Sequence, residues 1–349
     1  MKAVYLNTSS SFNTNLRSDT LWGLIISALS VLKPKSEIDE IINQFKSNNP
    51  SFAISSAFSY SIGEDNKIVH FFPKPIVCNF DYNIDSAWKM TIYKKFKKIN
   101  FVNENVFQDL INGIESDKDL FQKFIKLNEL ENKGANLNDD EKKNKKKLSL
   151  MFMNPFFKKE LILHNTIDRM SGSTLDSEDG GQLFHSEDTF IEKNSGLYFL
   201  VDGDINIIEP ALRFLSHFGF GGNNTTGKGF FKYAIKDFNL KVPTVNINSF
   251  ITLSLFNPKA EELSEFLKVE NKNKLWYETD FRAGRIGVHF ADDPSKNQKN
   301  IVANFKEGST FPDIVEKYPG RIIQTASSKS HDIFNYAFSF KISSNLKYE

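Results

Sequence analysis

Residues 219–229 read GFGGNNTTGKG, and this glycine-rich segment is the strongest local signal in the sequence. Five of its eleven positions are glycine, which reaches positive φ and lets the backbone lie close to a ligand. Successive backbone N–H groups in such a loop can form an anion-binding concavity. We expect the loop between an amphipathic helix over 206–218 and a strand over 230–235. Lys228 inside it and Arg213 two turns before it favour a backbone-phosphate site over the alternative, a flexible turn.

Two familiar phosphate-binding loops do not fit this segment. Residues 222–228 match G-x-x-x-x-G-K, but Gly229 follows where a P-loop has the Ser or Thr that holds Mg²⁺. The order helix, loop, strand is also the reverse of the order in a P-loop. Residues 219–224 lack the last Gly or Ala of the dinucleotide fingerprint and its βαβ context. The segment therefore argues against nucleotide hydrolysis and against dinucleotide binding.

The composition is that of a folded globular protein. The chain has 349 residues, of which 40% are hydrophobic and 25% charged, and this length indicates about two domains. The single cysteine, Cys78, excludes a disulfide framework and a thiolate zinc cluster. The low cysteine content and the lack of a recognisable secretory signal together favour a cytoplasmic protein. The longest apolar run, over 21–32, is shorter than the ~20 residues that span a bilayer.

The charge balance gives no global signal for nucleic acid, because the net charge is +1. A local stripe of cations would still be sufficient for RNA. The chain has six arginines and 38 lysines, so lysine runs carry little information and the rare arginines carry more. We interpret Lys94–Lys98 as a solvated face. The stretch 131–147, which ends in a lysine run, is expected to be a solvated or mobile loop, with a phosphate-tracking arm as the alternative.

The periodicity predicts an α+β fold. A helix begins at Ser18 or Asp19, carries an apolar stripe over 21–32 and ends at Pro34. A long hairpin is expected over 161–201, with a polar loop over 171–181. The remaining strands are expected at 1–6, 52–60, 67–72, 247–255, 275–277, 286–290 and 336–342, and the remaining helices at 38–45, 103–130 and 259–267. This order suggests two ferredoxin-like units, 1–241 and 242–349, that meet near Val242-Pro243-Thr244.

A glycine-rich loop between the last helix and last strand of such a unit resembles the CRISPR RAMP superfamily. Three further segments strengthen the resemblance. Residues 16–23 (LRSDTLWG) are similar to the opening of the family's first helix. Residues 163–169 (LHNTIDR), with 172–174 and 181–184, are similar to the arms of its inserted hairpin. Residues 277–287 and 331–338 are similar to its C-terminal half. Together they resemble the fourth Csm subunit of type III-A effector complexes, a Cas-five-like family, from about 16 to 340, with 103–150 unmatched.

The resemblance implies two ferredoxin-like, RRM-like RAMP domains with a helical insertion at about 103–150 and a hairpin thumb at about 161–201. It implies a non-catalytic, cytoplasmic RNA-binding subunit in antiviral defence. Such a subunit grips the repeat-derived 5′ handle of the crRNA and wedges its thumb between nucleotides at the handle–guide junction. It contacts the large polymerase-like subunit and caps the backbone RAMP filament. No membrane, metal or cofactor is expected beyond the bound crRNA.

Residue by residue, the resemblance and the local chemistry predict one RNA-binding set and a weaker wedge. An Arg fork suits a phosphate or a base face, although Arg169 could instead pair with Asp168, and His164 could be structural. The wedge would be Met170 and Leu175. The RNA-binding set is Arg17, His164, Arg169, Gly219, Gly221, Gly222, Asn223, Thr225, Thr226, Gly227, Lys228, Gly229, Arg282 and Arg285.

Two other functions stay open at this point. A metal-independent endoribonuclease processing repeat RNA could use His164 together with His185 across the hairpin. A nucleotide-binding protein could use 222–228. Asp19 is interpreted as a first-turn acid beside a capping Ser18. The set His217, His289, Asp292 and Asp293 lacks metal-ligand spacing, so no metal site is expected.

Overall fold

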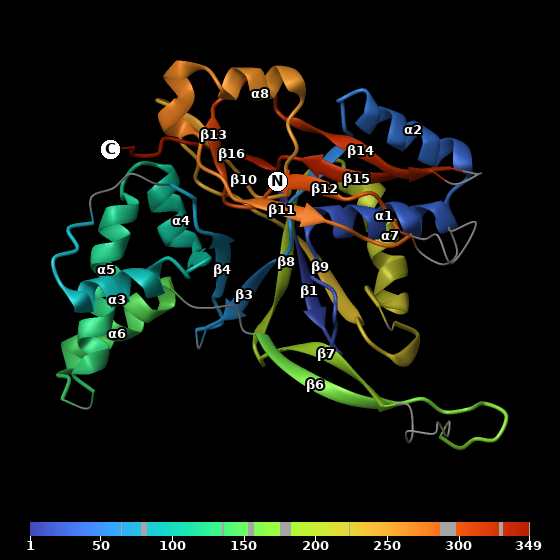
Figure 1. Cartoon of the computed structure of the whole chain (residues 1–349), viewed down its shortest axis with the longest axis horizontal. Coiled ribbons are helices and arrows are strands. Elements are labelled where there is room, and N and C mark those ends of the chain that lie inside the picture. The colour runs from blue at the N-terminus through green and yellow to red at the C-terminus, as the bar shows by residue number, and fades with distance from the viewer. Residues whose placement is uncertain are drawn as a thin grey trace.

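The computed structural model describes residues 1–63, 65–77, 82–134, 136–152, 157–174, 183–222, 224–286, 298–327 and 331–348 (Figure 1). It is an α+β fold whose strand pairings are antiparallel, as the sequence predicts. The largest sheet has the order β5-β4-β3-β8-β1-β9, with β2 also paired to β8. Its strands are β1 (Lys2–Thr8), β2 (Phe52–Ile54), β3 (Phe58–Ile62), β4 (Ile68–Pro73), β5 (Phe101–Asn103), β8 (Ser195–Gly203) and β9 (Phe231–Asp237).

Helices α1 (Ser18–Leu32) and α7 (Ile205–Phe218) cover one face of this sheet. Alternation along β1 sends Val4 and Leu6 into the core beneath them. Most of the predicted stripe of α1 is buried, but Leu24 is partly buried and Leu32, at the end, is 46% exposed. The helix α2 (Lys35–Lys46) buries Ile41 and Phe45 beside α1. The amphipathic pattern over 206–218 therefore predicted α7 correctly.

A helical lobe lies against the other face of the sheet, at the left of Figure 1. It consists of α3 (Ala87–Phe96), α4 (Glu104–Ile111), α5 (Asp117–Asn132) and α6 (Asp139–Met151). Phe107 stacks on Phe72 of β4 with ring centroids 4.6 Å apart. The expectation of a loop over 131–147 is wrong, because α6 forms there. Asn138 and Glu141 make a capping box and Leu148 is buried, which fixes the helix despite its lysines.

The C-terminal part distributes its strands over three small sheets, β13-β10-β16, β11-β12 and β14-β15. Phe250, Phe256, Phe266 and Phe311 form a small core beneath β10, β13 and α8, whereas Tyr336 and Phe338 of β15 belong to the core under α1. The strand and helix expected at 247–255 and 259–267 are present as β10 and α8, whereas most of the strand expected at 286–290 lies outside the described residues. The bounds are β10 (Ser249–Thr252), α8 (Ala260–Phe266), the 3₁₀ helix η2 (Val269–Lys274), β11 (Thr279–Arg282), β12 (Val302–Phe305), β13 (Thr310–Pro312), β14 (Gly320–Ser327), β15 (Asp332–Phe338) and β16 (Lys341–Ser344).

Three consecutive residues at the start of α1 bind the C-terminal part, and we call these contacts the clasp. Arg17 pairs with Asp280 and Glu307, with Nε 3.0 Å from the Glu307 carboxylate. The Ser18 hydroxyl accepts a hydrogen bond from the Leu255 N–H at 2.9 Å. Asp19 accepts from Arg282 Nε at 2.8 Å and Nη2 at 3.1 Å. The N-cap is Arg17 and has no side-chain cap bond, so the expectation that Ser18 or Asp19 caps the helix is wrong.

A two-stranded ribbon projects from the body at the lower right of Figure 1. It pairs β6 (Phe157–Asn165) with β7 (Leu183–Ile191) over nine residues of each strand. The predicted hairpin over 161–201 is therefore divided. Its second arm forms β7 in the ribbon and then β8 in the main sheet.

We predict that Asp19→Ala lowers the free energy of unfolding by about 1.5–3 kcal/mol, because it removes two charged hydrogen bonds and leaves Arg282 without its partner. Denaturant unfolding of the full chain measures this. Glu37→Ala is the matched control, since it breaks an exposed pair with Lys33 and is expected to cost at most about 0.5 kcal/mol. Equal losses in the two variants would contradict the role of the clasp.

Candidate nucleic-acid interface

The glycine-rich loop is shaped by positive φ angles at both of its ends. Gly219 has φ +77° and Gly229 has φ +74°. A Cβ on Gly229 would lie 2.0 Å from the Phe220 carbonyl oxygen, and one on Gly219 would lie 2.7 Å from the Lys228 carbonyl oxygen. These close approaches fold the two ends against each other. The middle of the loop forms a short 3₁₀ helix, η1 (Asn224–Thr226).

The loop rests on the segment that follows β1. The Gly229 N–H donates to the Ser11 carbonyl at 2.8 Å, and the Gly222 N–H lies 3.3 Å from Thr14 Oγ1. Residues 222 and 225–227 are exposed. The predicted residues Gly222, Thr225, Thr226 and Gly227 thus form an outward surface, whereas Gly221 is half-buried and faces the side chain of Thr14. Asn223 lies outside the described residues.

Lys228 does not point outward with them. It is 8% exposed, and its ammonium lies 2.6 Å from Asp188 and 3.1 Å from the Ser186 hydroxyl, both on β7. The only lysine of the loop therefore contacts the ribbon, not the solvent where a phosphate would lie.

Asp188 is the centre of a buried polar network at the base of the ribbon. It is fully buried and accepts hydrogen bonds from Lys228, from Ser11 at 2.7 Å and from Ser186 at 3.0 Å. Burial acts to raise the pKa of the Asp188 carboxyl, but the hydrogen bonds from Lys228, Ser11 and Ser186 outweigh it and hold the pKa below its usual value. The carboxylate is therefore ionised at neutral pH and paired with the Lys228 ammonium.

His164 joins this network from β6. Its Nε2 lies 2.9 Å from the Ser186 hydroxyl, and its ring stacks on Phe184 with centroids 5.1 Å apart and planes 17° apart. The register pairs His164 with Phe184 and Leu163 with His185. Directly opposite residues share a face, and neighbours along a strand point to opposite faces. The imidazoles of His164 and His185 therefore lie on opposite faces of the ribbon. They cannot act together as acid and base on one phosphate, as the proposed cleavage would require.

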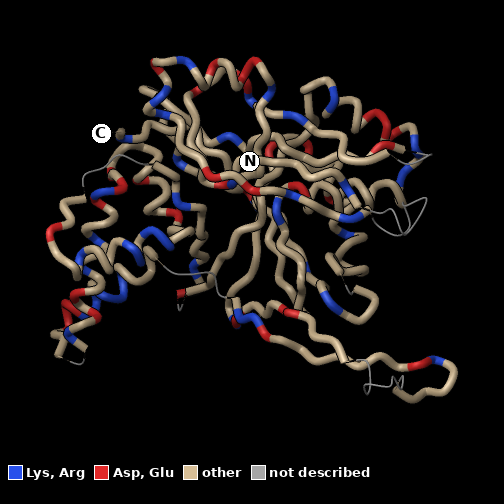
Figure 2. Tube along the Cα trace, in the orientation of Figure 1, with Lys and Arg blue, Asp and Glu red and all other residues tan. Residues whose placement is uncertain are grey.

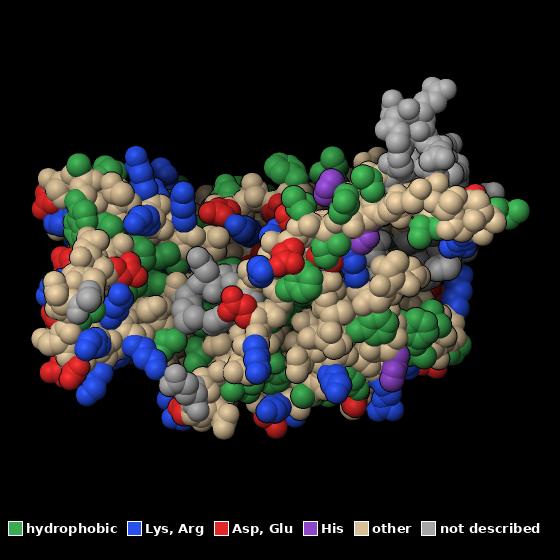
Figure 3. Space-filling view, turned by 90° about the horizontal axis from the view of Figure 1, so that it is seen from below, with side chains coloured by type: hydrophobic (Ala, Val, Ile, Leu, Met, Phe, Trp, Pro, Cys, Tyr) green, Lys and Arg blue, Asp and Glu red, His purple; other side chains and the backbone are tan. Residues whose placement is uncertain are grey.

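The outer part of the ribbon is apolar and nearly neutral. Leu161, Leu163, Leu183 and Phe184 are all more than half exposed. The cations Lys158 and Lys159 are paired with Glu160 and Glu187 at 2.5 Å. Figure 3, which views the ribbon from its open side, shows hydrophobic side chains along it. Such a surface suits base faces or apolar protein groups more than a bare phosphate backbone.

Arg169 lies in a turn beyond the paired strands. Asp168 accepts hydrogen bonds from the Met170 N–H at 3.0 Å and from Ser171, so it stabilises the turn and does not pair with Arg169. These bonds, the Met170 N–H first, lower the pKa of Asp168. Arg169 is exposed and has no ion pair with any described residue, while Met170 is 95% exposed. Leu175, the other wedge residue, lies outside the described residues.

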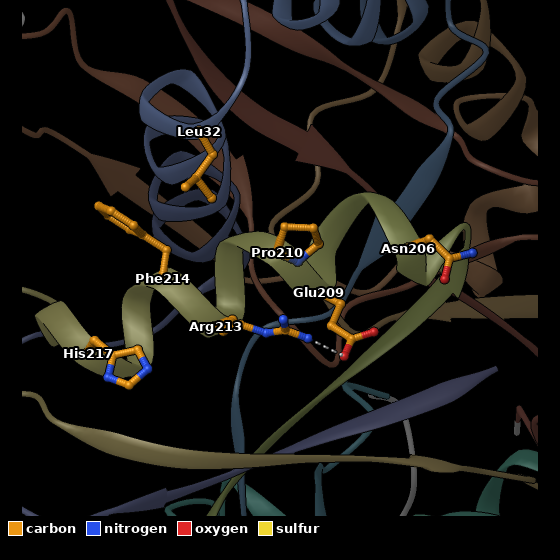
Figure 4. Close-up of a pocket in the computed structure, with 7 residues that line it drawn as sticks. All are labelled: Leu32, Asn206, Glu209, Pro210, Arg213, Phe214 and His217. Carbon is orange, nitrogen blue, oxygen red and sulfur yellow. Dashed lines mark ion pairs between the residues drawn. The ribbon is translucent and has the colours of Figure 1, made fainter.

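The other predicted arginines lie elsewhere. Arg17 and Arg282 belong to the clasp, so their donors are held by carboxylates. Arg285 is exposed, and its backbone forms an isolated antiparallel β-bridge with Gln298. Arg213 turns back to Glu209 on its own helix at 3.7 Å and lines a shallow pocket of about 400 Å³ with Leu32 of α1 (Figure 4). The structure thus places the predicted RNA-binding residues in three regions: the loop and ribbon, the clasp, and the 283–286 segment.

Cations and anions are interleaved along the part of the trace that the structure describes (Figure 2). Within the described ranges, no three His, Cys, Asp or Glu side chains gather as a metal site would need. His289, Asp292 and Asp293 lie outside the described residues. No helix of the described chain is long and apolar enough to cross a bilayer.

Sequence reasoning missed Asp188, Ser186 and Ser11. The available signal was the spacing in β7, since Phe184, Ser186 and Asp188 alternate onto one face of a strand. Asp188 shares that face with Phe184, and an acid is almost never fully buried unless it is paired. Which cation pairs with it depends on the tertiary fold.

Comparison with known proteins agrees with this architecture. Residues 246–343 match the family model of the CRISPR Csm4 C-terminal domain. The chain is 26% identical to the "CRISPR system Cms protein Csm4" of Thermococcus onnurineus, over 99% of this chain and 96% of that protein. A Csm4 protein of Methanocaldococcus jannaschii is 33% identical over 72 residues, 19% of each chain.

Solved structures share the fold. A chain of the Csm1-Csm4 cassette in complex with pppApA superimposes with a TM-score of 0.58 at 18% identity, covering 99% of this chain and 98% of that chain. A chain of the Csm3-Csm4 subcomplex of the type III-A interference complex gives 0.57 at 16% identity, covering 98% and 99%. These findings confirm the resemblance carried by the sequence motifs: the chain is similar to Csm4 proteins along its whole length.

We predict that Gly229→Ala destabilises the fold more than Gly227→Ala. Both residues have positive φ, +74° and +90°, and the left-handed backbone costs an L-residue about 1–2 kcal/mol. A Cβ on Gly227 meets nothing within 4 Å, whereas one on Gly229 would overlap Phe220, which adds about 1–3 kcal/mol. Denaturant unfolding of the two variants measures the difference. Equal destabilisation would show that the close approach of the loop ends is not maintained.

Proposed function

We propose that this chain is the Csm4 subunit of a type III-A CRISPR effector complex and that it binds RNA without cleaving it. It would grip the repeat-derived 5′ handle of the crRNA and cap the backbone filament beside the large polymerase-like subunit. Beyond the whole-length similarity, one observation carries the proposal: the projecting ribbon and the exposed backbone of the glycine-rich loop meet at one place, through Lys228 and Asp188.

We propose two ferredoxin-like RAMP domains, over 1–241 and 242–349. The architecture supports the first of them, whereas the second rests on the resemblance alone, because its strands lie in three small sheets. In the main sheet the order β9-β1-β8-β3, with α1 after β1 and α7 before β9, is the order of a βαββαβ unit. The helical lobe and the β6–β7 ribbon are insertions into this unit. We propose that the ribbon is the thumb of the family.

The assembly partners come from the relatives. Similar Csm4 chains occur in a Csm1-Csm4 cassette and in a Csm3-Csm4 subcomplex. We propose that this chain binds the corresponding large subunit and backbone subunit, and that crRNA is its only bound cofactor.

The proposed grip relies on shape more than charge. The exposed loop surface at 222 and 225–227 would lie against handle phosphates, with the Thr225 hydroxyl as a donor, because the Gly222 and Gly227 N–H groups already donate to Thr14 Oγ1 and the Asn224 carbonyl. Arg169 would bind a phosphate or stack on a base, and the apolar ribbon with Met170 would stack on or displace a base at the handle–guide junction. Stacking contributes about 1–3 kcal/mol per base, so a few contacts are sufficient to define where the handle ends. Neither general acid–base chemistry nor a metal enters this account.

We predict that Arg169→Ala weakens binding of handle RNA by the chain co-purified with its large subunit, and lowers the slope of log K against log salt by about one if the guanidinium binds a phosphate. Filter binding over a range of salt concentrations measures both. Lys133→Ala, which removes a cation paired with Glu141 in the distant helical lobe, is the control and should change neither. Unchanged affinity and slope in Arg169→Ala would remove the ribbon turn from the grip.

A further inference from the structure

The buried ion pair between the ribbon and the glycine-rich loop carries an inference that rests on the proposed function and deepens it. We propose that Asp188 and Lys228 form a lock that positions the ribbon, so that Lys228 acts on RNA only through the ribbon and is not itself a phosphate ligand. Asp188 and Lys228 are positioning residues in this account.

The ribbon needs such a contact, because an isolated pair of strands is at best marginally stable and does not fix its own direction. At its base, Phe157 and Ile191 pack against the core of the main sheet. Phe12 and Thr189 then exchange backbone hydrogen bonds of 3.1 and 2.7 Å. Asp188 is the next residue toward the tip, and its side chain reaches the loop and Ser11 together. Lys228 reaches one step further toward the tip, to the Ser186 hydroxyl at 3.1 Å. Among the contacts that the described residues make, the lock with this hydroxyl thus holds the ribbon to the body beyond its backbone pairing with Phe12.

The surroundings of Lys228 oppose a direct role on phosphate. Its ammonium has a carboxylate at 2.6 Å and a hydroxyl at 3.1 Å, and it is buried. Asp188 is fully buried, so turning Lys228 outward would leave an uncompensated carboxylate in the interior, which is strongly unfavourable. The cation consequently stays with Asp188 when RNA binds, and it releases no counterion from the RNA.

The same pair also shapes the loop. Lys228 lies between Gly227 and Gly229. A Cβ on Gly219 would lie 2.7 Å from the Lys228 carbonyl oxygen, so only a glycine at 219 lets the chain pass this close. With the Lys228 side chain directed inward to β7, the chain on its N-terminal side turns outward, where Gly227 is exposed. One ion pair thus sets the exposed loop backbone and the ribbon relative to each other.

The test combines a distance measured without RNA and a salt slope measured with it. Spin labels are placed at the exposed sites Asn165→Cys on the ribbon and Lys232→Cys on β9, in a Cys78→Ser chain co-purified with its large subunit. Pulsed electron–electron double resonance then gives the distribution of distances between the two labels in the parent, in Asp188→Asn and in Lys228→Met. Asp188→Asn preserves side-chain volume, and circular dichroism checks that each variant is folded. Lys159→Ala, which removes an exposed ribbon lysine paired with Glu187 at 2.5 Å, is the matched control.

We expect Asp188→Asn and Lys228→Met to broaden the distance distribution and to weaken handle-RNA binding about tenfold, which corresponds to about 1.4 kcal/mol, while the salt slope stays that of the parent. Lys159→Ala should leave the distribution unchanged. An unchanged distribution together with a slope lowered by about one in Lys228→Met would overturn the lock and make Lys228 a phosphate ligand. Broadened distributions in a chain that binds no handle RNA at all would support the lock and refute the proposed function.

Discussion

The ion pairs of Asp19 with Arg282, and of Arg17 with Asp280 and Glu307, join the two halves of the chain beside a hydrophobic core to which Tyr336 and Phe338 contribute from the C-terminal half. They lie at the start of α1, whose buried face packs with α7 in one core. The last turn of α7 leads directly into the glycine-rich loop, and that loop positions the ribbon. A displacement at the clasp would therefore reach the proposed RNA surface through α1 and α7. The segment 16–23, which resembles a family motif, has a structural role here, because Arg17, Ser18 and Asp19 bind the C-terminal part.

The proposed interface has two kinds of group: charged side chains paired within the protein, and an outward surface available to RNA. The charged side chains of the clasp and of the Asp188–Lys228 pair fix one segment against another, and those exposed on the ribbon, Lys158 and Lys159, are paired with Glu160 and Glu187. The outward surface consists of glycine-rich backbone, apolar side chains of the ribbon and the exposed Arg169. This division is consistent with a net charge of +1 and only six arginines. A surface of this kind recognises the path and the stacking of an RNA more than its charge.

Local patterns predicted what local forces decide. The 3.6-residue stripe of α7, the glycine-rich loop after it and the strand that follows are present as expected, because helix periodicity and glycine backbone freedom act within a few residues. Lys228 and Arg17 could not be assigned from sequence, since their partners lie 40 and 290 residues away. The lysine run of α6 was misinterpreted for a different reason: the capping box at Asn138 and the single buried Leu148 outweigh its polarity.

The account as a whole depends on one claim, that this chain binds the repeat-derived 5′ handle of the crRNA in an assembled complex. The most direct measurement is to tag the chain, co-express it with its neighbouring genes and a repeat–spacer array, purify the assembly and sequence the 5′ ends of its RNA. The account predicts a uniform end derived from the repeat, in the presence of a large subunit and a backbone subunit. Random ends, or an assembly free of RNA, would contradict it.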